Sequence, residues 1–149
     1  QTEGFNLNFM NEKGEKERAV MIHAAITGSL ERFMSILIEH VAGKFPLWLS
    51  PEQIRVLTIT DRSNEYAEEI CKKLTEAGLR ASVDPKSHSI SKKVREAQLA
   101  KVNYMVTLGD KEVEKKTLSI RTRDGKVKFD VKVEDFIKDL KKEVEEKSK

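Results

Sequence analysis

Residues 54–59, with the sequence IRVLTI, decide the fold class of this chain. This nearly continuous apolar run is typical of a strand that is buried on both faces of a sheet. The residues that follow predict a helix from a cap at Ser63 to Ala77, with apolar residues at helical spacing and Gly78 directly after it. A buried strand followed by an amphipathic helix predicts a right-handed crossover to a parallel neighbouring strand.

The same alternation continues along the chain and then changes. We expect a strand over residues 79–83, a helix over residues 90–101 and another buried strand over residues 104–108. Two further strands, over residues 117–123 and 126–131, enclose an Asp-Gly pair that favours a type I′ hairpin turn. An amphipathic helix then begins at the next apolar residues and ends the chain.

Residues 50–149 therefore predict an α/β domain, in which helices pack against a mixed, mainly parallel sheet of about five strands. The sequence of residues 1–49 indicates only part of another domain. In this part, residues 5–10 alternate between apolar and polar, residues 11–14 form a turn, and residues 19–23 are expected to return as a second strand.

A helix with a continuous apolar stripe completes the first 49 residues. Two strands and this helix cannot bury the stripe alone, so we interpret the segment as the antiparallel sheet-and-helix remnant of a larger domain. A stiff linker around Pro46 and Pro51 joins it to the second domain. The stripe consists of Leu30, Phe33, Met34, Leu37, Ile38 and Val41.

Charge is distributed unevenly along the chain. Residues 50–149 carry 23 Lys and Arg against 19 Asp and Glu, a net charge of +4, whereas the whole chain has a net charge of +3. A single cysteine, Cys71, excludes an internal disulfide and is typical of a reducing cytosol. No apolar stretch is long enough to span a bilayer, and no signal peptide is recognisable. We therefore expect a cytoplasmic protein with no membrane partner.

Two basic segments indicate an anionic partner. One is the stretch from Lys86 to Lys101, and the other is the predicted hairpin. Alternation in the hairpin predicts that Leu118, Ile120, Val127, Phe129 and Val131 face the core, while Ser119, Arg121, Arg123, Lys126 and Lys128 point outward.

Arginines on a rigid strand suit phosphates or the edge of guanine, and Glu112 suits a base amino group. An ordinary charged surface explains these basic segments about equally well. The sequence has no glycine-rich phosphate loop and no Cys or His pair at metal-ligand spacing, so we expect binding rather than catalysis from this domain.

Several motifs resemble class II aminoacyl-tRNA synthetases, and most narrowly the threonyl-tRNA synthetase family. Residues 21–33, MIHAAITGSLERF, are similar to motif 3 of these enzymes, and residues 42–49 are similar to the linker after it. Residues 60–66, 109–114 and 120–125 resemble their anticodon-binding domain in order and spacing. The resemblance implies a parent enzyme that activates threonine with ATP and Mg²⁺ and transfers the threonine to tRNA. It further implies that this enzyme is a homodimer and that DNA is not a partner.

The resemblance also assigns roles in the parent's catalytic domain. Arg32 matches an arginine that contacts ATP, and His23 matches one ligand of a zinc ion that binds threonine. The other zinc ligands would precede Gln1, and class II motifs 1 and 2 are missing from the chain. We therefore expect no bound zinc or ATP and no aminoacylation by this chain alone.

In the second domain, Glu112 and Arg121 match residues that read anticodon bases, and Arg123, Ser87 and Lys86 complete the expected site. The family commonly has asparagine where this chain has Ser87. Two alternatives stay open. One is a related synthetase of the histidyl, prolyl or glycyl type, against which His23 and the linker argue. The other is an accessory or editing protein that uses the domain to dock tRNA.

Overall fold

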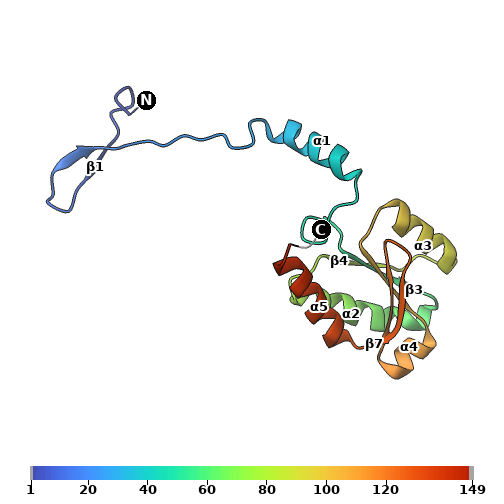
Figure 1. Cartoon of the computed structure of the whole chain (residues 1–149). Coiled ribbons are helices and arrows are strands. Elements are labelled where there is room, and N and C mark those ends of the chain that lie inside the picture. Colours follow the sequence, from blue (N-terminus) through green and yellow to red (C-terminus); the bar gives the residue numbers. More distant parts are fainter. Residues whose placement is uncertain (1, 148–149) are drawn as a thin grey trace. The chain divides into compact units, whose positions relative to one another are not determined.

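The computed structural model describes residues 2–147, which divide into two units with a boundary in the sequence between Leu37 and Ile38 (Figure 1). In the first unit, β1 (Asn8–Met10) pairs antiparallel with β2 (Lys16–Arg18). The Asn11 side chain closes the turn, because its Oδ1 accepts hydrogen bonds from the backbone amides of Lys13 at 3.0 Å and Glu15 at 2.9 Å.

This tight turn places the returning strand earlier than expected. Met10 lies opposite Lys16, so the pairing ends at Arg18, and residues 19–25 form no strand. The predicted strand over residues 19–23 was therefore wrong.

Helix α1 (Leu30–Val41) buries none of its residues. Leu30 is 61% exposed and Met34 is 49% exposed, although both belong to the apolar stripe. The described part of the chain leaves this stripe without a cover.

The second unit contains a five-stranded sheet in the order β4-β3-β5-β6-β7. Strand β3 (Ile54–Thr58) is parallel to β4 (Ala81–Asp84) and β5 (Tyr104–Leu108). Strand β6 (Leu118–Thr122) is antiparallel to β5 and to β7 (Val127–Val131). The mixed sheet of five strands is thus confirmed, but its pairings divide equally into two parallel and two antiparallel, so the pairings are not mainly parallel as predicted.

Helices cover the two sides of this sheet unequally (Figure 1). Helix α2 (Asn64–Glu76), preceded by a 3-10 turn η1 (Asp61–Ser63), and helix α5 (Val133–Glu145) pack on one side, here called the α2 face. Helix α3 (Ile90–Leu99) packs on the other side, the α3 face, over β3 and β5. The α2 face buries the sheet residues Ile54, Val56, Val106, Leu108, Leu118 and Ile120.

A short helix, α4 (Asp110–Lys115), lies between β5 and β6 and was not expected from the sequence. It has no apolar stripe, but its start carries a capping signal, because the Glu112 side chain returns to the backbone amide of Gly109. No helix among residues 2–147 has the length and apolar character needed to cross a membrane.

The β6–β7 turn differs from the predicted type I′ turn. Gly125 has φ +87, but Asp124 does not have a positive φ, as type I′ would require. The Gly125 amide instead donates to the Thr122 carbonyl at 2.9 Å, and the Thr122 hydroxyl accepts from the Lys126 amide at 3.2 Å. The threonine side chain thus stabilises a different turn at the predicted position.

A bulge in β7 changes which side chains face the core. Leu118 lies opposite Val131, but Ile120 lies opposite Lys128, so β7 contains one extra residue. The extra residue shifts by one position the alternation of side chains between the two faces of the sheet. Asp130, in this bulge, adopts a left-handed φ of +54.

Val131 therefore stays on the α2 face, as predicted, whereas Val127 pairs with Arg121 on the α3 face. Phe129, two residues after Val127, also belongs to the α3 face and is 70% exposed. The prediction that Val127 and Phe129 face the core was wrong. Lys128 instead lines a small cavity on the core side.

Candidate nucleic-acid interface

Arg121 lies on the α3 face of the sheet. It belongs to β6, its Cα partners are Met105 and Val127, and its side chain is half-buried. Among residues 2–147, no hydrogen bond or ion pair engages its guanidinium group. A positioned arginine with free donors is suited to phosphate or to a base edge.

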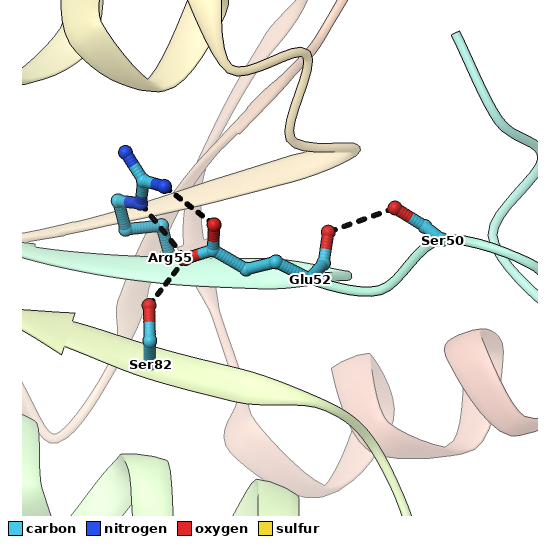
Figure 2. Close-up of polar contacts among 4 residues, drawn as sticks. All are labelled: Ser50, Glu52, Arg55 and Ser82. Atoms are coloured by element: carbon cyan, nitrogen blue, oxygen red, sulfur yellow. Dashed lines mark hydrogen bonds and ion pairs between the residues drawn. The ribbon is translucent and has the colours of Figure 1, made fainter. Parts of the chain in front are cut away.

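A second arginine of the α3 face, Arg55, is already engaged, as Figure 2 shows. Its Nε donates to Glu52 Oε1 at 2.8 Å and its Nη2 pairs with Glu52 Oε2, while the Ser82 hydroxyl donates to the same carboxylate. Burial opposes ionisation of Glu52, but the hydrogen bonds from Arg55 and Ser82 outweigh it and lower the pKa of the carboxyl group.

Arg55 and Arg121 lie in one row across the sheet, because both are Cα partners of Met105. The Glu52 carboxylate neutralises Arg55 within the protein. Arg121 therefore supplies the guanidinium group of this row that is available to a ligand.

Glu112 lies in the first turn of α4 rather than in a loop. Its Oε2 accepts from the backbone amide of Gly109 at 3.0 Å, which fixes the carboxylate at the end of β5. This contact leaves Oε1 able to accept a hydrogen bond from a base amino group. No hydrogen bond or ion pair joins the described side chains of Glu112 and Arg121.

Lys86 and Ser87 are exposed in the loop between β4 and α3. The loop begins in a fixed conformation, because Asp84 Oδ1 accepts from the Lys86 amide at 3.1 Å.

Lys93, which the sequence analysis did not single out, anchors the strands next to this loop. It is only 2% exposed, and its Nζ donates to the carbonyls of Thr58 at 2.9 Å and Asp84 at 3.0 Å. The sequence offered one signal that Lys93 is buried: its position falls on the side of α3 that packs on the sheet.

Arg123 turns toward the linker. Its Nη1 donates to the carbonyl of Phe45 at 2.9 Å, and Asn103 Nδ2 donates to the same carbonyl at 3.0 Å. The structure thus ties the end of β6 to the linker, and a base contact by Arg123 stays a prediction.

His23 and Arg32 lie in the first unit, and both are exposed. A zinc site requires three or four protein ligands. Among residues 2–147, no group of three or more His, Cys, Asp or Glu side chains is arranged to hold a metal ion. The described residues therefore do not fit a complete zinc site, to which His23 would contribute one ligand.

Comparison with known proteins identifies the family of the second unit, which contains the five-stranded sheet. The profile of the anticodon binding domain matches residues 53–143, from the start of β3 into α5. The chain belongs to the anticodon-binding domain family. Arg121, Glu112 and the Lys86 loop all lie inside the matched segment, and His23 and Arg32 lie outside it.

Relatives of this anticodon-binding domain confirm the resemblance to threonyl-tRNA synthetases. The chain is 50% identical over 145 residues to the threonine–tRNA ligase of Protochlamydia amoebophila, which covers 97% of the chain and 22% of that protein. The chain thus spans about a fifth of the length of the curated relatives it matches.

Solved structures share the fold. The crystal structure of the RNA binding domain of threonyl-tRNA synthetase from Cryptosporidium parvum Iowa II has a TM-score of 0.76 at 36% identity, covering 93% of this chain and 35% of that one. A prolyl-tRNA synthetase from Cryptosporidium parvum has a TM-score of 0.66 at 20% identity, covering 97% of this chain and 33% of that one, a likeness that shows the fold alone.

Proposed function

We propose that this chain is the anticodon-binding end of a threonine–tRNA ligase and that it recognises the anticodon loop of threonine tRNA. The observation that carries the proposal is the guanidinium group of Arg121 on the α3 face, which no residue among 2–147 engages and which lies inside the segment that matches the anticodon-binding family. The 50% identity to a threonine–tRNA ligase supports threonine tRNA rather than another tRNA.

Unstacked bases of a loop present their hydrogen-bonding edges to protein side chains. Arg121 donates to an acceptor edge or to a phosphate, and Glu112 accepts from a base amino group through Oε1. The exposed Lys86 and Ser87 contact the loop backbone. Association depends on salt, because the domain's positive charges displace counterions from phosphates.

The whole enzyme would join threonine to tRNA with ATP as a homodimer in the cytoplasm. The exposed apolar stripe of α1 supports this view, since the rest of a catalytic domain would cover it. In that domain Arg32 would contact ATP and His23 would provide one zinc ligand.

The test is Arg121→Ala, measured as the affinity for threonine tRNA and for tRNA with altered anticodon bases. We expect a loss of about 1–3 kcal/mol and weaker discrimination between bases, as for a direct base contact. Lys138→Ala is the matched control, since it removes one charge from α5 on the other side of the sheet. If the variant lowers only the salt dependence and discriminates bases as before, base reading by Arg121 is contradicted.

A further inference from the structure

Phe129 is exposed in a way that its position in a sheet does not require. It is 70% exposed, and it is the only exposed aromatic residue among the described residues of the second unit, 38–147. Phe136 on α5, by contrast, is 4% exposed in the core. A solvent-exposed phenyl ring on a strand is unfavourable without a partner, because it leaves apolar surface in water.

The bulge in β7 is what points Phe129 outward, and other elements hold the bulge in place. Asp130 has a left-handed φ of +54, and its Oδ1 accepts from Lys115 Nζ at 3.2 Å and from the Thr117 hydroxyl at 3.5 Å. The bulge is therefore tied to the end of α4 and to the segment that leads into β6. A position fixed by contacts to separate elements is suited to present a side chain to a ligand.

Phe129 shares the α3 face with Arg121. Val127 is the Cα partner of Arg121, and Phe129 follows two residues later on the same side of β7, about 7 Å further along the strand. Lys115, which holds the bulge, is the last residue of the helix that carries Glu112. Phe129 thus lies on the same sheet face as Arg121, and the residue after it, Asp130, contacts the last residue of α4.

We propose that the ring of Phe129 is a stacking platform for one unpaired base of the tRNA anticodon loop. This inference rests on the function proposed above. A planar ring stacks on any base, whereas the neighbouring guanidinium supplies hydrogen bonds to an adjacent base or phosphate. Phe129 supplies affinity and holds the loop open, and Arg121 supplies the contact that depends on base identity.

The surroundings favour RNA over a protein partner. On the α3 face, the strand neighbour of Phe129 is Val127, which is half-buried and is the Cα partner of the positively charged Arg121. A stable protein interface buries roughly 800 Å² on each partner, far more than one ring provides. The net charge of +4 over residues 50–149 also matches an anionic partner.

The experiment measures binding of the full chain to the anticodon stem-loop of threonine tRNA, with 2-aminopurine replacing single loop bases. We expect Phe129→Ala to weaken binding about tenfold and to remove the fluorescence quenching that stacking causes at one loop position. Phe129→Tyr keeps the ring and should bind like the unchanged protein. Phe129→Leu keeps the apolar side chain but not the ring, and should bind like Phe129→Ala.

Leu99→Ala is the matched control, because Leu99 is an apolar residue of α3 that is 72% exposed. If Phe129→Ala and Phe129→Leu bind and quench as the unchanged protein does, the stacking proposal is overturned. The stacking proposal is also overturned if Phe129→Ala abolishes self-association in sedimentation but leaves binding of the stem-loop unchanged. Failure of the unchanged protein to prefer the threonine anticodon would instead contradict the proposed function, so the two failures are distinguishable.

Discussion

Two arginines of the α3 face show how neighbours determine what a residue is available to do. Arg55 on β3 and Arg121 on β6 flank Met105 of β5, the strand between them. The sequence presents both as strand arginines with equal potential for ligand binding. Glu52 neutralises Arg55, and no described residue does the same for Arg121. The difference depends on the conformation of the chain before β3, which sequence patterns do not reveal.

The pKa of Glu52 leads to a prediction about pH. The hydrogen bonds from Arg55 and Ser82 lower this pKa in the folded protein, so the carboxylate stabilises the fold above its unfolded pKa of about 4.3. That stabilisation is lost as the pH falls through the lower, folded pKa. We expect Glu52→Gln to reduce the free energy of unfolding at pH 7 by about 1 kcal/mol or less, because solvent screens this half-buried pair.

The measurement is urea denaturation of both proteins at pH 7 and at pH 3. The difference between them should shrink at pH 3, and Glu68→Gln, an exposed glutamate of α2, should change little at either pH. A difference that is equally large at both pH values would rule out this role for the Glu52 carboxylate.

At the scale of elements, the regular strands and long helices follow from local patterns, and the irregular parts do not. Apolar runs and amphipathic stripes correctly predicted β3, β5, α2, α3 and α5 to within a few residues. The bulge at Asp130 depends on Lys115 and Thr117, which belong to other segments, so alternation within β7 alone placed Phe129 on the wrong side. Helix α4 has a capping signal but no apolar stripe, and it is too short for helical periodicity to predict it.

Lys93 connects α3 to two strands and leads to a prediction about stability. Its buried ammonium group donates to the Thr58 carbonyl and hydroxyl and to the Asp84 carbonyl. Lys93→Met keeps the length of the side chain but leaves these acceptors without their donor. We expect the free energy of unfolding to fall by roughly 2 kcal/mol, since unsatisfied buried acceptors cost about 1–3 kcal/mol.

Chemical denaturation of Lys93→Met and Lys92→Met compares the two positions directly. Lys92 is the exposed neighbour of Lys93, and its replacement should have little effect. Equal stability of the two variants would show that the buried ammonium group does not hold the strand ends together.

At the scale of the whole molecule, the linker belongs structurally to the anticodon-binding unit. The Phe45 carbonyl accepts from Asn103 and Arg123, and the Leu47 carbonyl accepts from Gln53 at 2.8 Å. The prolines predicted a stiff linker, but sequence patterns did not predict which side chains would hold it. Motif similarity predicted Arg121 and Glu112 as site residues, whereas it gave no reason to consider Phe129 or Lys93.

We propose above that this domain reads the anticodon of threonine tRNA. The most direct test is the affinity of the unchanged chain for threonine tRNA transcripts in which the second and third anticodon bases are exchanged one at a time, at fixed salt. We expect each exchange to weaken binding by roughly 1–3 kcal/mol, as for loss of a direct base contact. Equal affinity for all the transcripts would contradict this proposal.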